Sequence, residues 1–250
     1  MSEIAQLFGN RAAAYASFRP HYPDALFQWL AQQSPSTERA LDIACGSGQA
    51  SEPLLAHFRQ VVACDASVEQ LAASETLQAT SVFAADATAI PLASRSLDLI
   101  IVAQALHWFA GPSFFNEVQR LLKPDGLFCA WCYGLMSIDE AIDEVINDFY
   151  WNTLSGYWPA GRASIEAGYR DIHSPLQPIA MPAFSMQAQW SFDHLLGYLR
   201  TWSACQLWER KNGRDPVADV APALEKVWRD VKQPRFVNWP LHFLAGSPSR

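Results

Sequence analysis

The stretch that most constrains this chain is a buried strand that runs through a glycine turn into a helix. Apolar residues 41–44 predict the strand, Gly46 and Gly48 break it, and apolar spacing over 49–58 predicts the helix. Backbone N–H groups at such a helix start point outward, and glycine leaves the approach to them open. Two glycines in a strand–helix turn are common, so this stretch alone predicts an α/β unit and only a candidate ligand site.

A carboxylate ends the next predicted strand. Residues 61–64 are apolar, and Asp65 follows them directly. An acid at this place in a nucleotide-binding α/β fold accepts hydrogen bonds from ribose hydroxyls. Asp65 would otherwise simply begin the next helix. Ser67 is the better start, because it opens a capping-box pattern, and this leaves the carboxylate of Asp65 for another role.

Strands and helices continue to alternate along the chain. The segment 96–104 is almost entirely apolar, as expected of a central parallel strand, and a helix over 114–122 separates it from the next strand. This alternation predicts an α/β fold with a mostly parallel sheet and helices on both faces. The predicted strands are residues 41–44, 61–65, 81–86, 96–104, 127–133, 185–192 and 235–245.

Composition excludes several classes of protein. The chain has 18 basic and 25 acidic residues and no basic run, which argues against nucleic acid as a partner. No apolar run is long enough to span a membrane, and no signal-peptide pattern opens the sequence. Most of the five cysteines, including the pair Cys129 and Cys132, lie within strand-like runs, so we interpret them as core residues in a reducing compartment. We therefore expect a cytoplasmic protein without membrane association.

These motifs together resemble the S-adenosylmethionine-dependent methyltransferases with a Rossmann-like sheet. The glycine turn and the acidic strand ends carry the resemblance, and the segments 105–109 and 121–126 match the type 11 branch. The resemblance covers at least residues 39–133. It implies a Rossmann-like, seven-stranded and mostly parallel α/β fold with S-adenosylmethionine as cofactor. Ala44 stands where the family often has its first glycine, and a side chain this small should disturb binding little.

The resemblance also implies which residues bind the cofactor. Asp42 would help to hold its amino group, Asp65 would bind the ribose, and Asp86 would contact the adenine. Each carboxylate also has a purely structural interpretation, as a strand end or a turn former. The implied cofactor residues are Asp42, Ala44, Gly46, Gly48, Asp65, Asp86, Ala87, Gln104 and Tyr15.

Candidate acceptor residues follow the fourth strand and recur in the tryptophan-rich second half. Ligands of open α/β sheets lie beyond the carboxyl ends of the strands, so Gln104, His107 and Trp108 should face the reacting atoms. A histidine beside a tryptophan is as often a packed pair, so His107 is a candidate for both binding and catalysis. The candidate acceptor residues are Arg19, Tyr22, His107, Trp108, Trp131, Trp158, Arg200 and Trp202.

The second half also suggests the reaction. Residues 19–23, 157–159, 168–172 and 198–204 resemble the subgroup of trans-aconitate methyltransferase, whose members esterify carboxylates of small acids. We therefore expect O-methylation of a small-molecule carboxylate. A carboxylate is ionised near neutral pH and needs a cationic or N–H-rich clamp, for which Arg19, Arg200 and His107 are candidates.

Several alternatives stay open. A phenol, a quinone precursor or a carrier-protein-bound carboxylate would be the acceptor of a related methyltransferase, and a phenol would need a base such as His107. A non-catalytic cofactor-binding protein is a further alternative. A nicotinamide oxidoreductase is disfavoured, because Ser51 stands where the dinucleotide fingerprint has glycine or alanine. No metal-ligand pattern is visible, so we expect no metal. The sequence does not define the oligomeric state.

The predicted elements divide the chain into three parts. Helical patterns dominate its beginning, alternation dominates the middle, and helices return after residue 136. We expect an N-terminal helical cap over residues 1–35, a cofactor-binding core over 36–136, and a cap insertion with the last two strands of the sheet over 137–250.

Overall fold

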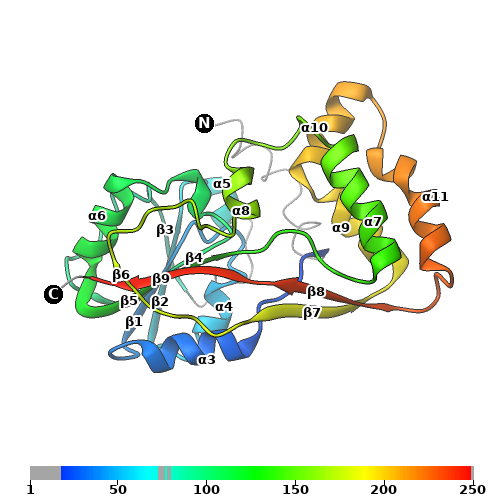
Figure 1. Cartoon of the computed structure of the whole chain (residues 1–250). Helices are drawn as coiled ribbons and strands as arrows, with labels where there is room; N and C mark the ends of the chain where they lie inside the picture. Colours follow the sequence, from blue (N-terminus) through cyan, green and yellow to red (C-terminus); the bar gives the residue numbers. More distant parts are fainter. Residues whose placement is uncertain (1–17, 73–76, 78–79, 249–250) are drawn as a thin grey trace.

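The computed structural model describes residues 18–72, 77 and 80–248, and a seven-stranded sheet lies at its centre (Figure 1). The strands of this sheet are β1 (Arg39–Ile43), β2 (Gln60–Asp65), β3 (Ser81–Ala84), β4 (Leu97–Ala103), β5 (Leu122–Cys132), β6 (Gln177–Pro178) and β9 (His242–Ser247). Their order is β3-β2-β1-β4-β5-β9-β6. The first five are mutually parallel, and β9 is antiparallel to both of its neighbours. The expected Rossmann-like, mostly parallel seven-stranded sheet is confirmed.

The sheet reverses its direction of growth between β1 and β4. The chain runs outward from β1 through β2 to β3, then returns to place β4 on the other side of β1. Loops that leave the carboxyl ends of these two strands therefore diverge to opposite sides. The crevice that this divergence opens is where open α/β sheets bind their ligands.

Helices cover both faces of the sheet, and the side chains of β4 therefore alternate between two hydrophobic cores, one on each face. Leu99 and Ile101 pack with α3 (Asp24–Gln33), whereas Ile100 and Val102 pack with α6 (Pro112–Leu121). The other core helices are short: α4 (Ser51–Leu54) and α5 (Val68–Ala72). The helix predicted over 49–58 is thus reduced to a single turn followed by further turns.

The two late strands predicted from the sequence do not both become strands of the main sheet. The segment 185–192 forms β7 (Ser185–Trp190), which pairs antiparallel with β8 (Arg235–Pro240) in a separate two-stranded sheet. The single strand predicted over 235–245 is interrupted after Pro240, and only its second part, β9, enters the main sheet. The outermost place is taken by β6, whose two residues carry no readable pattern.

Four of the remaining helices gather to one side of the sheet (Figure 1). They are α7 (Glu140–Asp148), which continues into the π-helical turn η3 (Phe149–Thr153), α9 (Phe192–Arg200), α10 (Ser203–Asn212) and α11 (Pro216–Trp228). The short helix α8 (Arg162–Glu166) lies apart from them and contacts the turn η2 (Leu106–Trp108). We call α7, α9, α10 and α11 the helical layer. The side chain of Ser191 caps α9, and that of Asp215 caps α11. Many late tryptophans are core residues here, among them Trp190, Trp228 and Trp239.

Three sequence expectations can be compared with the described ranges. All five cysteines are free and buried, in agreement with their interpretation as core residues. No helix in the described part of the chain has the length and apolar character needed to cross a bilayer. Among the same residues, no group of three or more His, Cys, Asp or Glu side chains could hold a metal ion. Residues 1–17 of the expected N-terminal helical cap lie outside the described residues.

Candidate active site

The glycine turn after β1 holds three residues in the left-handed backbone region. Ala44 has φ +57°, Gly46 has +54° and Gly48 has +86°. The turn is fixed to the end of β2, because the Gly46 N–H donates to Asp65 Oδ2 at 2.9 Å. Glycine adopts these angles freely, whereas Ala44 adopts them against a steric penalty. The tight turn brings main-chain atoms to the crevice.

The acids at the ends of β2 and β3 stabilise loops at the carboxyl edge. The second oxygen of Asp65, Oδ1, accepts from the Ser67 N–H at 2.8 Å. Asp86 Oδ1 accepts from both the hydroxyl and the N–H of Thr88, at 2.6 and 2.8 Å, and these bonds hold the pKa of Asp86 below its usual value. A carboxylate has about four acceptor positions, so both acids keep capacity for a ligand.

A cavity of about 500 Å³ lies over this edge of the sheet. Such a volume is typical of a small-molecule site. Six of the residues expected to bind the cofactor line it together: Ala44, Gly46, Asp65, Asp86, Ala87 and Gln104. Tyr22, expected to contact the acceptor, also lines this larger cavity. Tyr15 lies outside the described residues.

Asp42 and Gly48 do not line the larger cavity. Asp42 is fully buried beneath the turn, and its Oδ2 accepts from the Ser51 hydroxyl at 2.6 Å. Burial raises the pKa of Asp42 to about 7, although the Ser51 bond opposes that rise. Oδ1 has no hydrogen-bond partner among the residues that the structure describes. Asp42 therefore supports the turn from below, while Gly48 closes it through a bond from its N–H to the Cys45 carbonyl.

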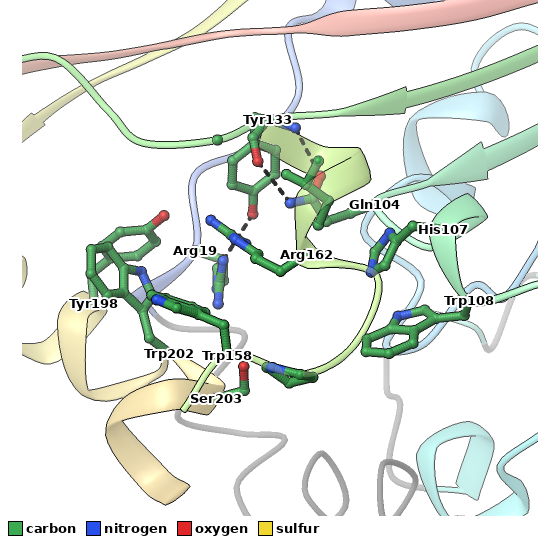
Figure 2. A pocket seen from close by; sticks show the side chains of 13 residues that line it. Arg19, Gln104, His107, Trp108, Tyr133, Trp158, Arg162, Tyr198, Trp202 and Ser203 are labelled. Carbon is green, nitrogen blue, oxygen red and sulfur yellow. Dashed lines mark hydrogen bonds between the residues drawn. The ribbon is translucent and has the colours of Figure 1, made fainter. Parts of the chain in front are cut away.

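A smaller cavity of about 80 Å³ adjoins the larger one (Figure 2). Gln104, Trp108 and Tyr133 line both cavities, so these residues form the wall between them. The rest of the smaller cavity comes from segments far apart in sequence. Its other principal side chains are Arg19, His107, Trp158, Arg162, Tyr198 and Trp202.

Two guanidinium groups line the smaller cavity, and each lies over an aromatic ring. Arg19 lies 5.0 Å from the ring centroid of Tyr198, and its Nη1 donates to the Tyr133 hydroxyl at 3.1 Å. Arg162 lies 4.6 Å from the Trp158 ring centroid, and its Nε donates to the Tyr150 hydroxyl. Aromatic faces and phenol oxygens thus hold both cations, and Arg162 Nε also lies 4.0 Å from Glu166 Oε1.

His107 lies at the rim of the smaller cavity. Its Nδ1 is 3.4 Å from the Tyr169 hydroxyl, and its ring packs against Trp108 with 4.5 Å between the centroids. Burial and, to a lesser degree, the charge of Arg162 lower the pKa of His107 to about 4. His107 is therefore neutral near pH 7 and a weak base.

Two expected acceptor residues lie away from both cavities. Trp131 is fully buried, with its ring against Tyr22 and Phe27. The guanidinium of Arg200 pairs with Asp215 at 2.7 Å beside the helical layer, where Asp215 also caps α11. Arg200 is on the exposed side of α9, one helical face away from Tyr198, which does line the smaller cavity.

Sequence reasoning missed Arg162, Tyr133 and Tyr198. Arg162 follows Gly161 in a loop-rich segment without periodicity, so nothing local indicates where its side chain lies. Tyr133 ends a predicted strand and would have been found by the rule that places ligands at carboxyl ends. Tyr198 precedes Arg200 by half a helical turn, so the two side chains lie on opposite sides of α9. Tyr198 is on the buried side and lines the smaller cavity, whereas Arg200 is on the exposed side.

Comparisons with known proteins agree with this architecture. A family described as a methyltransferase domain matches residues 41–130. A protein of Dictyostelium discoideum, described as a methyltransferase, is 31% identical over 89% of this chain and 86% of its own length. A Saccharomyces cerevisiae protein, described as an S-adenosylmethionine-dependent methyltransferase, is 25% identical over 84% of each chain.

A solved structure extends the similarity to nearly the whole fold. This protein from Anaeromyxobacter dehalogenans, described as a type II methyltransferase, is 38% identical, covers 92% of this chain and 99% of its own, and has a TM-score of 0.86. The fold alone is shared with phosphoethanolamine N-methyltransferase 2 of Haemonchus contortus, solved with S-adenosylmethionine, at a TM-score of 0.52 and 15% identity. The chain belongs to the S-adenosylmethionine-dependent methyltransferases.

Proposed function

We propose that the larger cavity holds S-adenosylmethionine and that the smaller cavity holds the methyl acceptor. Asp65 and Asp86 offer carboxylate oxygens to the ribose hydroxyls and the adenine amino group, and the backbone around Gly46 faces the methionine part. The volume of about 500 Å³ and the position at the reversal of the sheet support this assignment. Asp42 acts from beneath the turn and not by direct contact.

The favoured acceptor is a carboxylate of a small molecule. The bound cofactor supplies an activated methyl group, so the protein has to align the acceptor oxygen and exclude water. The observation that carries this proposal is the pair of guanidinium groups, Arg19 and Arg162, on the wall of the smaller cavity. Guanidinium groups bind carboxylates through paired hydrogen bonds, and about 80 Å³ suits a small acid. The resemblance to the trans-aconitate subgroup supports the same acceptor.

The state of His107 also favours a carboxylate. A carboxylate is ionised near neutral pH and reacts without a base, whereas a phenol or an activated carbon must lose a proton. His107 is the candidate base, but with a pKa of about 4 it would accept that proton weakly. His107 therefore acts as a neutral binding residue at the rim.

A panel of acceptors tests the reaction. Benzoate, succinate, fumarate and citrate are compared with phenols, amines and quinone precursors, and methyl transfer is followed by mass spectrometry. We expect turnover of one or more acids, at a rate that stays flat above the pKa of the acid. Activity confined to phenols or carbon acceptors, and lost in His107→Ala, would overturn the carboxylate proposal and make His107 the base.

Substitution of Arg162 tests the acceptor site. Arg162→Lys keeps a positive charge but loses the planar fork and its stacking on Trp158. We expect the acceptor KM to rise about tenfold while the affinity for S-adenosylhomocysteine stays unchanged, since one charge-assisted hydrogen bond contributes roughly 1.5–3 kcal/mol. Arg170→Lys, an exposed change in the same segment, is the matched control. Equal KM values in both variants would remove Arg162 from the site.

A further inference from the structure

The chain turns sharply out of the sheet at the end of β4. The last pair of the β4–β5 ladder is Ala103 with Trp131, and the Gln104 N–H still donates to the Trp131 carbonyl at 2.8 Å. Gln104 then adopts φ +57°, in the left-handed region that residues with a side chain rarely occupy. Such strain persists where surrounding bonds hold it, and it concentrates at functional sites.

The side chain of Gln104 accepts the hydrogen bond that its main-chain carbonyl would accept in a regular ladder. In a parallel ladder the carbonyl of residue 104 would accept the next hydrogen bond, from the Tyr133 N–H. Instead, Gln104 Oε1 accepts from that N–H at 2.8 Å, and Nε2 donates to the Tyr133 carbonyl at 2.9 Å (Figure 2). The amide thus closes the end of the ladder while the main chain departs toward residues 105–108.

Two segments diverge at this point, the one after Gln104 and the one that contains Tyr133, and both of them line the smaller cavity. The main chain after Gln104 carries His107 and Trp108 to one side, while Tyr133 stays at the sheet. Tyr133 lines both cavities, and its hydroxyl accepts a hydrogen bond from Arg19. The position of Tyr133 therefore affects the shape of the larger cavity and the place of a cation in the smaller one.

We infer that Gln104 is a positioning residue, whose side-chain amide fixes Tyr133 as the wall between the two cavities. This role differs from the direct cofactor contact that the sequence suggests for Gln104. The inference rests on the proposed use of the larger cavity for the cofactor, and part of its test needs no ligand at all.

Two substitutions separate positioning from ligand contact. Gln104→Leu removes both bonds to Tyr133, whereas Gln104→Glu keeps the acceptor and loses the donor. In the ligand-free protein, hydrogen exchange at the Tyr133 amide should be at least about tenfold faster in the Leu variant, because the N–H loses its partner, and slow in the Glu variant. Unchanged exchange in the Leu variant would overturn the inference, because a residue acting only through the ligand has no effect on the empty protein.

Cofactor-product binding gives a second comparison. In Gln104→Glu a carboxylate oxygen faces the Tyr133 carbonyl oxygen near neutral pH, and we expect S-adenosylhomocysteine to bind about tenfold more weakly than to the unmodified protein, by calorimetry. Gln104→Leu, which loses both bonds to Tyr133, should also bind more weakly.

Controls distinguish the possible failures. Gln32→Glu, exposed on α3, should bind S-adenosylhomocysteine like the unmodified protein. If Asp65→Ala leaves the affinity unchanged, the cavity assignment fails. If Asp65→Ala weakens binding but Gln104→Leu does not, the positioning role is overturned.

Discussion

Ala44 adopts a strained backbone conformation within the glycine turn. Its φ of +57° is a conformation that glycine adopts freely, and the family resemblance places glycine at this position. A methyl group is the smallest side chain that L-residues offer, and it lines the larger cavity here. The strain is local, because the bond from Gly46 to Asp65 holds the turn in place.

Replacing Ala44 with glycine should therefore be neutral or stabilising. Relief of the left-handed strain contributes roughly 1–2 kcal/mol, and the greater freedom of the unfolded chain opposes it by roughly 0.4–1 kcal/mol. We expect the free energy of unfolding in urea to rise by between zero and about 1.5 kcal/mol. Ala40→Gly, in the buried strand β1, is the control and should destabilise. A loss in Ala44→Gly as large as in the control would contradict this account.

The hydroxyl of Tyr133 offers a second test at the level of one residue. Tyr133→Phe keeps the ring in the wall but removes the acceptor of the Arg19 hydrogen bond. We expect the acceptor KM to rise about tenfold and the cofactor affinity to change little, since bonds to charged groups contribute roughly 1.5–3 kcal/mol. Tyr157→Phe also loses a hydroxyl bond, to Asn212, outside both cavities. Similar kinetics in the two variants would show that Tyr133 does not hold Arg19 for the acceptor.

At the level of elements, α8 depends on a glycine that lets it approach the loop after β4. Gly161 precedes α8 with φ +87°, and a Cβ at this position would lie 3.1 Å from His107 Cδ2 and 3.2 Å from the His107 carbonyl oxygen. Arg162, the first residue of α8, then reaches the smaller cavity. The contact between α8 and His107 thus sets the position of one of the two guanidinium groups.

Gly161→Ala should disturb this contact and weaken the binding of the acceptor. The added methyl group moves α8 away from His107, so we expect a higher acceptor KM while S-adenosylhomocysteine binds as before. Gly156→Ala is a matched control, because φ there is +78° and nothing lies within 4 Å of the added Cβ. Both variants share a backbone penalty of roughly 1–2 kcal/mol, and only Gly161→Ala adds the collision. Equal acceptor kinetics would contradict the proposed role of α8.

The elements also show what local sequence can and cannot predict. The central strands were predictable because parallel strands are buried on both faces and appear as apolar runs. The strand-end acids were predictable because parallel topology brings all carboxyl ends to one edge. The partner of β7 was not, since pairing with β8 is decided between residues far apart in sequence. The choice of Arg162 over Arg200 was likewise hidden, because it depends on the path of a loop and on which side of α9 is buried.

For the whole molecule, one buried group, Asp42, and one half-buried group, His107, make stability respond to pH in opposite directions. The folded protein lowers the pKa of His107 from 6.5 to about 4, so the unfolded chain binds that proton more readily and stability falls as pH drops through this window. The pKa of Asp42 rises from 3.8 to about 7, so the folded protein binds that proton more readily and stability falls as pH increases toward 7. The two dependences oppose each other.

Substituting either residue should leave only the pH dependence that the other one causes. Relative to the unmodified protein, the free energy of unfolding of His107→Gln should increase as pH is lowered from about 7 to about 4, and that of Asp42→Asn should decrease. Urea denaturation at several pH values measures both differences. Differences that do not vary with pH would show that neither group changes its proton affinity on folding.

The pairing of β5 with β9 has a consequence for biosynthesis. A ribosome makes β5 long before β9, with residues 133–241 in between, so the edge of the nascent sheet stays uncovered throughout that interval. Its exposed N–H and C=O groups invite pairing with other nascent chains, and slow, long-range closure prolongs the exposure. Holding chaperones would find their target at this edge, and synonymous codons that slow elongation after residue 132 would lengthen the time at risk.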